Sequence, residues 1–258
     1  MITAIPASTA RQVALVTGGA KRLGRAIVSD LAAHGFAVAV HYNSSRRDAD
    51  ELVDGIIRDG GRAVAVAADL GDPECVGGIF ATAAAALGPV TLLINNASVF
   101  EKETVGSLDH ALWDRQMGIN LMRPVFLAEA FAGQLPDGVD GNVVNILDQR
   151  IWRPTPAFFS YQLTKSALAV ATTMLAQALA PRVRVNGIAP GPVLPSVYKT
   201  QEQFDREAAT LPLGHAPAVA DFGQTIRYLV ETRSLTGQVI TLDSGQHIEV
   251  PEMAPRTK

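Results

Sequence analysis

Cysteine and aromatic residues are scarce in this sequence. Cys75 is the only cysteine among 258 residues, so no disulfide can form within the chain, which suits a reducing cytoplasm. Aromatic residues make up 6% of the chain, whereas hydrophobic residues of all kinds make up 48% and charged residues 18%. The single cysteine excludes a fold that depends on internal disulfides. The proportions fit one α/β domain, spanning residues 1–258, that is long enough to bury a large core.

The sequence also lacks an excess of one charge and a long apolar run, and we expect no targeting segment. Its 22 Lys and Arg residues nearly balance 25 Asp and Glu residues, so we expect no nucleic-acid partner. The start, Met1 to Gln12, contains Pro6 and Arg11 and no long apolar run of the kind found in targeting segments. The apolar runs are shorter than the ~20 residues that span a bilayer, so we expect no membrane segment. No histidine-rich context surrounds Cys75, which is interpreted as an inert helix residue, and no metal site is predicted.

Short apolar runs alternate with helix-length segments along the chain. The predicted strands are Val13–Thr17, Ala37–His41, Ala63–Ala67, Val90–Asn95, Asn142–Ile146, Val183–Asn186 and Val239–Leu242. The predicted helices are Arg22–His34, Asp48–Asp59, Pro73–Leu87, Asp109–Gly133 and Ser160–Ala180. This alternation predicts a single-domain α/β fold, a Rossmann-type doubly wound parallel sheet of about seven strands with helices on both faces. Ligands of such sheets bind beyond the carboxyl ends of the strands.

Two segments fall outside this alternation. The segment from Pro190 to about Pro217 is predicted to be a long irregular loop. In a compact domain such a loop is typically a lid or a binding loop, and we expect it to decide which substrate is accepted. The C-terminal tail, residues 250–258, carries two prolines and mixed charge and is interpreted as coil at the surface or against a partner.

A glycine-rich turn follows the first predicted strand. Its sequence is Thr17-Gly18-Gly19-Ala20-Lys21-Arg22-Leu23-Gly24. Glycines permit a tight strand-to-helix turn and close approach of the backbone to a pyrophosphate, which then faces the helix N-terminus. Because the turn sits in a βαβ pattern, a dinucleotide site is favoured over a simple turn. Lys21 and Arg22 oppose the helix dipole, so an anionic ligand explains them better than a solvated helix start does.

The end of the second strand discriminates between the two nicotinamide cofactors. It reads His41-Tyr42-Asn43-Ser44-Ser45-Arg46-Arg47, and no acidic residue appears before Asp48. An NAD site places an acidic residue here for the ribose 2′-hydroxyl, whereas hydroxyls, an amide and arginines suit a 2′-phosphate. NADP(H) is therefore the predicted cofactor. Asp69, followed by Leu70, is expected either to bind the adenine amino group or to cap the next helix.

A tyrosine and a lysine are spaced to share one helix face. Tyr161 and Lys165 lie four residues apart in a predicted helix, so both side chains can point into one cleft. An ammonium beside a phenol lowers the tyrosine pKa, which would let the phenol deliver a proton near neutral pH. Asp148 lies thirteen residues before Tyr161, and a carboxylate beside the phenol suggests a substrate other than a plain ketone.

Together these residues resemble the short-chain dehydrogenase/reductase family. The matching motifs, which follow the family order over nearly the whole chain, are Thr17-Gly18-x-x-x-Arg22-x-Gly24, Asn95-Asn96-Ala97, Asn120, Tyr161-x-x-x-Lys165 and Pro190-Gly191. Four features look like the pteridine reductase branch, to which dihydromonapterin reductases are similar: Arg22 for the middle glycine, Asp148 for the catalytic serine, His41-Tyr42, and Asn96-Ala97-Ser98-x-Phe100. The resemblance implies NADPH-dependent reduction of a pterin substrate (dihydropterin, dihydromonapterin or dihydrofolate) to the tetrahydro form.

The resemblance also implies a role for each matching residue. Tyr161 would donate the proton, with Lys165 lowering its pKa, Asp148 relaying protons and Asn120 holding a water. The implied substrate contacts are Arg22, Ser98, Phe100, Asp148 and Tyr161, with Phe100 stacked on the flat pterin. The implied cofactor contacts are Gly18, Lys21, Arg22, Leu23, Gly24, His41, Tyr42, Asn43, Ser44, Ser45, Asp69, Leu70, Asn96, Ala97, Ser98, Tyr161, Lys165, Pro190 and Gly191. Pro192-Val193-Leu194 replaces a region where many members hold the nicotinamide amide with a threonine, which leaves backbone groups to serve.

Several alternatives stay open at this point. One is a carbonyl reductase of the same fold, acting on 3-oxoacyl thioesters or small ketones, and another is a non-catalytic NADP-binding sensor. Asp148 argues against the first, and the intact Tyr161 and Lys165 argue against the second. Phe158-Phe159 either line the pocket or pack the start of the helix. The resemblance implies a homotetramer in which the helices predicted at 109–133 and 160–180 pair between subunits, although the small residues of the second also suit packing within one subunit.

Overall fold

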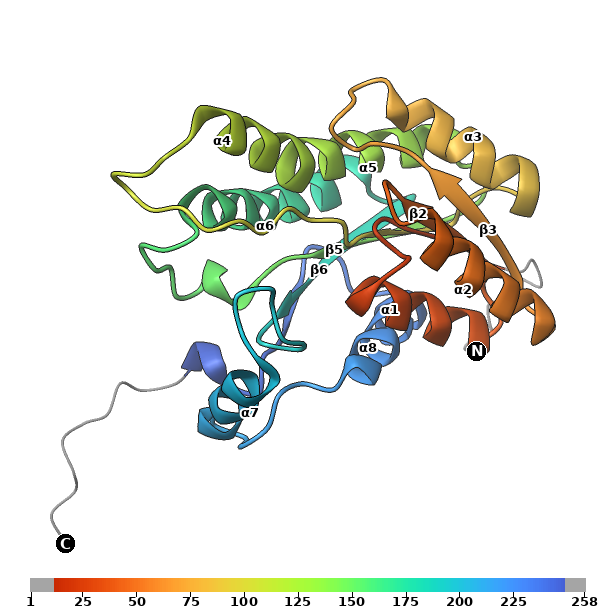
Figure 1. Cartoon of the computed structure of the whole chain (residues 1–258). Coiled ribbons are helices and arrows are strands. Elements are labelled where there is room, and N and C mark those ends of the chain that lie inside the picture. Colours follow the sequence, from red (N-terminus) through yellow and green to blue (C-terminus); the bar gives the residue numbers. More distant parts are fainter. Residues whose placement is uncertain (1–11, 249–258) are drawn as a thin grey trace, which may run out of the picture.

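Seven parallel strands form one sheet in the order β3-β2-β1-β4-β5-β6-β7 in the computed structural model, which describes residues 12–248 (Figure 1). The strands are β1 (Val13–Val16), β2 (Ala37–Tyr42), β3 (Arg62–Ala67), β4 (Leu92–Asn95), β5 (Gly141–Ile146), β6 (Val183–Pro190) and β7 (Val239–Leu242). Every residue of β1, β2 and β4 is buried, as expected for central strands that are covered on both faces. The predicted doubly wound sheet is therefore confirmed.

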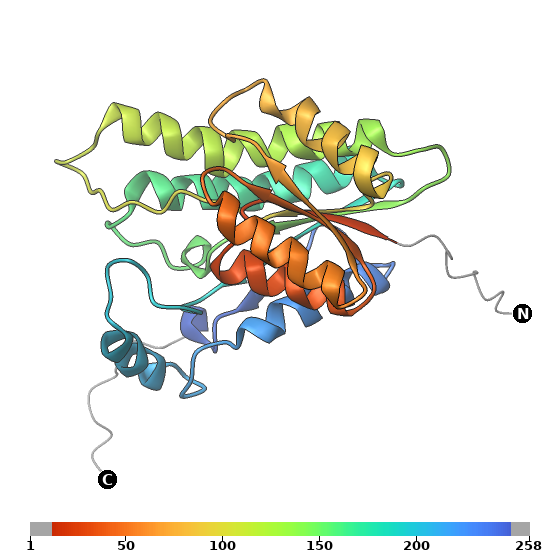
Figure 2. The same ribbon diagram turned by 45° about the vertical axis from the view of Figure 1, so that its right-hand side comes forward.

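Helices cover both faces of the sheet (Figures 1 and 2). One face packs against α1 (Arg22–Ala33), α2 (Arg46–Arg58) and α8 (Val219–Glu231), which share one apolar cluster. The other face packs against α3 (Cys75–Leu87), α5 (Arg123–Gln134) and α6 (Phe159–Leu179), which share a second cluster. The chain forms a single α/β domain, with two apolar layers separated by the sheet. Among residues 12–248, no helix is both long and apolar enough to cross a membrane.

The helical stretch predicted at 109–133 is present and contains a π-helical segment. The chain forms α4 (His110–Met117), then a π-helical segment (Gly118–Met122), then α5. A π-helical segment accommodates an extra residue within a helix and often marks a functional site. Here it contains Asn120, whose side chain is completely buried.

Two helices were not predicted from the sequence. The region expected to be irregular from Pro190 to Pro217 contains α7 (Gln201–Thr210), and α8 follows it. A capping box begins α7, since Thr200 accepts from the Gln203 N–H at 3.2 Å and the Gln203 side chain accepts from the Thr200 N–H at 2.9 Å. The Thr-x-x-Gln spacing was the available signal for α7. The buried apolar residues of α8, Phe222, Ile226 and Leu229, recur at helical spacing and were the signal for the second helix. The C-terminal tail, 250–258, lies outside the described residues.

The doubly wound topology has its switch point between β1 and β4. From β1 the chain builds β2 and β3 on one side of the sheet and later adds β4 to β7 on the other. Loops after β1 and β4 therefore diverge and leave a crevice at the carboxyl ends of these strands, which is where such sheets bind ligands.

Arg184 on β6 satisfies the C-terminal carbonyl groups of α8. Its guanidinium donates to the carbonyl oxygens of Leu229, Val230 and Thr232, and to that of Leu235 beyond the helix, at 2.7 to 3.1 Å. We predict that Arg184→Met lowers the free energy of unfolding by about 2–3 kcal/mol, because it leaves half-buried carbonyl groups without these donors. Urea denaturation measures this. The matched control is Arg233→Met, which removes an exposed ion pair with Asp140 and should cost less than about 1 kcal/mol; equal losses would contradict the capping role.

Candidate active site

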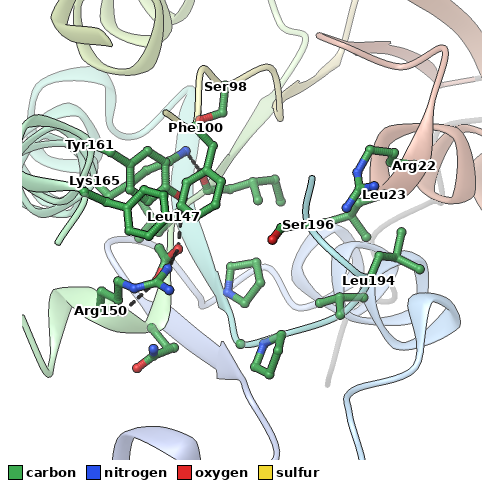
Figure 3. A pocket seen from close by; sticks show the side chains of 18 of the residues that line it. Arg22, Leu23, Ser98, Phe100, Leu147, Arg150, Tyr161, Lys165, Leu194 and Ser196 are labelled. Carbon is green, nitrogen blue, oxygen red and sulfur yellow. Dashed lines mark hydrogen bonds and ion pairs between the residues drawn. The ribbon is translucent and has the colours of Figure 1, made fainter. Parts of the chain in front are cut away.

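A cleft of about 650 Å³ opens at the carboxyl ends of the central strands (Figure 3). Many residues predicted to contact cofactor or substrate line it together: Arg22, Leu23, Asn96, Ser98, Phe100, Asp148, Tyr161, Lys165, Pro190 and Gly191. Pro192, Val193 and Leu194 line it as well. The other predicted site residues lie outside the lining: Gly18, Lys21, Gly24, His41, Tyr42, Asn43, Ser44, Ser45, Asp69, Leu70, Ala97 and Asn120. The fold thus brings the glycine turn, the Tyr161–Lys165 pair and the long loop after β6 to one cleft.

The glycine turn is tied to the segment that follows β4. The Asn96 amide donates to the carbonyl oxygens of Thr17 and Gly18 at 2.8 and 3.2 Å, and the Thr17 hydroxyl accepts from the backbone N–H groups of Asn96 and Ala97 at 2.9 and 3.0 Å. Gly18 has a φ of 61°, in the left-handed region that favours glycine. A Cβ on Gly24 would lie 2.2 Å from the Gly18 carbonyl oxygen. Only a glycine at position 24 permits this close approach.

The two cations of the turn are already engaged by the protein. The Lys21 ammonium pairs with Asp48 at 3.0 Å, and the Arg22 guanidinium donates to the Pro195 carbonyl oxygen at 2.8 Å. Asp48 therefore gives Lys21 an anionic partner within the protein, and contact of Lys21 with the cofactor stays a prediction. Arg22 lines the cleft, with a positive φ of 52°, and it bridges the glycine turn to the loop after β6.

His41 lies beneath the glycine turn rather than in the cleft. Its Nδ1 accepts from the Gly18 N–H at 3.0 Å, which leaves Nε2 as the donor to the Ala68 carbonyl oxygen at 3.2 Å. Burial lowers the pKa of His41 to about 4, so the imidazole is neutral at physiological pH and keeps the acceptor that Gly18 needs. Both ring nitrogens contact the backbone of the protein, and His41 holds the turn in place.

The segment after β2 supplies polar groups at the edge of the sheet. Asn43 and Ser44 are exposed, Ser45 is half-buried, and the Tyr42 side chain is buried in the core. The Asp69 carboxylate accepts from the Gly71 N–H at 2.9 Å and from the Asn43 amide at 3.2 Å. Asp69 does not cap α3, because that helix begins at Cys75 with Glu74 as its N-cap residue. Its alternative role, contact with the adenine, stays a prediction.

Asp148, Tyr161 and Arg150 form a connected group that lines the cleft. Figure 3 shows Tyr161 and Arg150 on the same side of it. The Tyr161 hydroxyl donates to Asp148 Oδ2 at 2.9 Å. Arg150 Nη1 donates to the same oxygen at 3.0 Å, and the Arg150 N–H donates to Oδ1 at 2.8 Å. Arg150 was not predicted from the sequence. The available signal in the sequence was a cation two residues after Asp148, the carboxylate that stands where the family has its catalytic serine.

The pKa of Tyr161 is shifted in the direction opposite to the one expected. Burial of the phenol and the adjacent Asp148 carboxylate raise it well above its ordinary value, and Arg150 only partly opposes them. The low pKa expected for Tyr161 is therefore wrong here. Lys165 Nζ donates to the Ile146 carbonyl oxygen at 2.7 Å and lies 5.8 Å from the centre of the Tyr161 ring. Burial lowers the pKa of Lys165 to about 8, so its ammonium is mostly charged at neutral pH.

Asn120 organises the segment that leads to the substrate side of the cleft. Its amide accepts from the Val99 N–H at 2.7 Å and donates to the Val99 carbonyl oxygen at 2.8 Å. Its Oδ1 also accepts from the Ser98 hydroxyl at 3.2 Å. These bonds fix the backbone just before Phe100. The predicted water between Asn120 and Lys165 stays a prediction.

An aromatic wall closes one side of the cleft. The Phe100 and Phe158 rings stack in parallel, with centroids 4.2 Å apart and planes 8° apart, and Tyr161 meets Phe100 edge-on at 4.8 Å. Tyr198, from the loop after β6, contacts both phenylalanine rings edge-on. Of the two alternatives for the Phe158-Phe159 pair, Phe158 lines the cleft, and Phe159 begins α6 and contacts Trp113.

Glu103 connects this wall to α6. Its carbonyl oxygen accepts from the Phe159 N–H at 3.3 Å, and its carboxylate accepts from the Ser160 N–H at 2.8 Å. The helix dipole favours a carboxylate at this end of the helix. Glu103 therefore fixes the start of the helix that carries Tyr161 and Lys165, from a segment that begins at Phe100.

Comparison with known proteins identifies the class. A family model described as short chain dehydrogenase matches residues 12–206, most of the chain. An uncharacterised oxidoreductase of Methylorubrum extorquens is 32% identical over 244 residues, which cover 91% of this chain and 97% of that protein. The chain therefore belongs to the short-chain dehydrogenase family and is an oxidoreductase.

More specific similarity comes from solved structures. The crystal structure of FolM alternative dihydrofolate reductase 1 from Brucella suis, in complex with NADP, is 51% identical with a TM-score of 0.92, over 94% of this chain and 98% of that one. The same protein from Brucella canis, complexed with NADP, is 52% identical with a TM-score of 0.91, over 95% and 98%. A blue fluorescent protein from a metagenomic library, in complex with NADPH, is 33% identical with a TM-score of 0.84, over 91% and 97%.

The burial of His41 predicts a pH-dependent stability. Because its pKa is about 4 in the folded protein and about 6.5 when unfolded, the unfolded chain binds the proton first as pH falls. The contribution of neutral His41 is thus complete above pH 6.5 and is lost between pH 6.5 and 4, at a cost of about 3 kcal/mol. Denaturant unfolding across this range should show a shallower pH dependence for His41→Gln, while the exposed His34→Gln should match the unmodified protein. An unchanged slope in His41→Gln would refute the assignment.

Proposed function

We propose that the protein is an NADPH-dependent reductase of pterins, which reduces a C=N bond of a dihydropterin, dihydromonapterin or dihydrofolate to the tetrahydro form. The observation that carries this proposal is the Asp148–Tyr161 hydrogen bond beside the Phe100–Phe158 stack. A carboxylate-supported phenol suits protonation of a ring nitrogen, and parallel aromatic rings suit a flat heterocycle. The two Brucella structures, which are named as dihydrofolate reductases, support the same reaction class.

The glycine turn fits a dinucleotide. The close packing of Gly24 on Gly18 would be lost with any side chain, and the turn leads directly into the N-terminus of α1, where backbone N–H groups favour a pyrophosphate. Asn43, Ser44 and Ser45 present an amide and two hydroxyls after β2 with no acidic residue before Asp48, which suits a 2′-phosphate. The NADP complexes of the Brucella proteins support NADP(H) over NAD(H). Bound NADPH would supply the hydride.

Tyr161 is the proposed proton donor. Its high pKa keeps the phenol protonated at neutral pH, with the hydroxyl aimed at Asp148. The O–H bond breaks as an N–H bond forms on the substrate nitrogen, which receives the electron pair of the C=N bond. Lys165, charged at neutral pH, offsets the negative charge left on the phenolate and would hold the nicotinamide ribose. Asp148 would then help to return a proton from solvent.

The substrate would enter against the aromatic wall and under the loop after β6. Phe100 would provide a stacking surface, with Ser98 and Arg22 lining the same cleft. Tyr198 joins the loop to the phenylalanine pair, so the residue identities of this loop would set which pterin is accepted. A carbonyl reductase remains the alternative, since an NADPH-dependent aldehyde reductase-like protein of Arabidopsis thaliana is 27% identical over 258 residues.

A substrate panel tests the reaction. NADPH oxidation should accompany reduction of dihydrobiopterin, dihydromonapterin or dihydrofolate, and be at least tenfold slower with small ketones and 3-oxoacyl thioesters. Tyr161→Phe should lower kcat about 100-fold or more, because it removes the donor hydroxyl, and Asp148→Asn should lower kcat as well. NADPH binding, followed by fluorescence, should persist in both variants.

Three outcomes of this panel would count against the proposal. Brisk reduction of ketones with no turnover of any pterin would establish carbonyl reduction instead. Full activity in Tyr161→Phe would show that another group donates the proton. NADPH binding without turnover of any substrate would favour a sensor.

We further propose that the protein acts in the cytoplasm as a homotetramer. Large apolar side chains of the π-helical segment, α5 and α6 are exposed on the chain: Met122, Phe126, Leu163, Val170 and Met174. Exposed apolar patches mark interaction surfaces.

Light scattering should therefore give a mass four times the chain mass of 27.3 kDa. Val170→Glu should reduce the mass, because a carboxylate on this surface would be buried in the contact without a partner. Ile57→Glu, at an exposed apolar residue of α2, is the control and should leave the mass unchanged. A monomer in the unmodified protein would contradict the proposal.

A further inference from the structure

Arg150 contacts both oxygens of the Asp148 carboxylate. Its backbone N–H donates to Oδ1 and its guanidinium donates to Oδ2, the oxygen that also accepts from Tyr161. About 27% of the Arg150 side chain and 12% of the Asp148 side chain are exposed, so this ion pair is largely shielded from water. A shielded, hydrogen-bonded pair of this kind interacts far more strongly than one at the surface. Arg150 therefore fixes the direction in which Asp148 faces the phenol.

The aromatic wall holds the guanidinium from its other side. The Arg150 guanidinium carbon lies 5.7 Å from the centre of the Phe100 ring and 5.5 Å from that of Phe158. Both distances are within the range of cation–π attraction. The same cation thus joins the proposed proton donor group to the proposed stacking surface.

Counting formal charges shows what this cation does during the reaction. Before proton transfer, Asp148 carries one negative charge, and Arg150 and Lys165 carry two positive charges. When Tyr161 gives up its proton, the phenolate adds a second negative charge, and the group of four becomes neutral. Without Arg150 the same step would leave two anions facing one cation in a site where burial already raises the pKa of Tyr161. The other charged residues that line the cleft are Arg22, Lys102, Lys199 and Glu207.

Lys199 and Glu207 pair with one another, and Arg22 donates to Pro195. Lys102 has no ion pair among residues 12–248 but is exposed, and its N–H donates to the Tyr198 hydroxyl. None of these four residues has a contact with Asp148 or Tyr161 that could replace Arg150.

We propose that Arg150 is a positioning residue for proton delivery, which holds Asp148 in line with Tyr161 and compensates the negative charge that forms when the phenol donates its proton. This inference rests on the proposed role of Tyr161 but not on the identity of the substrate. The same proton transfer would occur at a pterin nitrogen or at a carbonyl oxygen.

Arg150→Met, Arg150→Gln and Arg150→Lys separate charge from hydrogen bonding. With dihydropterin and NADPH, Arg150→Met should lower kcat about tenfold or more, the effect of roughly one pKa unit, and change KM less than threefold. The solvent deuterium isotope effect on kcat should rise, because proton transfer becomes slower than the other steps. Arg150→Gln keeps a donor without the charge and should resemble Arg150→Met, whereas Arg150→Lys should recover most of kcat. Arg115→Met, which removes an exposed pair with Glu101 outside the cleft, is the control.

Several results would overturn this role. A raised KM with kcat unchanged in Arg150→Met would make Arg150 a substrate-binding residue. Equal losses in Arg150→Lys and Arg150→Met would show that charge is not what matters, and recovery in Arg150→Gln would show the same. If Arg150→Met does not fold, Arg150→Gln and Arg150→Lys provide the comparison. If the unmodified protein reduces carbonyls but no pterin, the proposed function fails while the same comparison on the carbonyl substrate still tests Arg150; if it reduces neither, both proposals fail.

Discussion

The hydrogen bonds between the glycine turn and the end of β4 are the constraint on which the site depends. Thr17 and Asn96 exchange bonds across the switch point of the sheet, and His41 supports the Gly18 N–H from below. These hydrogen bonds fix the base of the cleft at the ends of β1 and β4, the two strands whose loops diverge. The remaining walls are added by segments that start from fixed strand ends, β5 for Asp148 and β6 for the long loop. A local network of short polar side chains therefore sets the position of groups that are far apart in the sequence.

Ionisable side chains around the cleft are stabilised by one another rather than by water. Tyr161 is 6% exposed and Lys165 is 3% exposed, yet the first stays neutral and the second mostly charged. Burial and the Asp148 carboxylate keep the Tyr161 phenol protonated, and the negative charge of Asp148 partly opposes the effect of burial on the Lys165 pKa. The arrangement separates two tasks, since Lys165 is anchored to the Ile146 carbonyl oxygen while Asp148 receives the phenol hydrogen bond.

The sequence was sufficient for the sheet because its strands are continuous apolar runs, and their number and parallel pairing follow from the alternation with helices. It was sufficient for most of the cleft because the turn, the Tyr161–Lys165 pair and Asp148 occur at recognisable spacings. It was insufficient where partners are distant in sequence. Lys21 pairs with Asp48, and Arg22 donates to the Pro195 carbonyl oxygen, and neither partner was predicted from the sequence. The direction in which the Tyr161 pKa shifts depends on burial, and the spacing of residues in the sequence does not show burial. Arg150 and α7 were missed although each had a local signal.

The contacts of Glu103 join the aromatic wall to α6, the helix that carries Tyr161 and Lys165. The segment 100–103 carries Phe100 at one end and, through Glu103, holds the first N–H groups of α6 at the other. A molecule that pushes Phe100 aside would therefore also pull on the helix that positions Tyr161. The proposed roles of Phe100 and Tyr161 would in this way be coupled through the backbone, so that a badly fitting molecule would lose reaction rate as well as affinity.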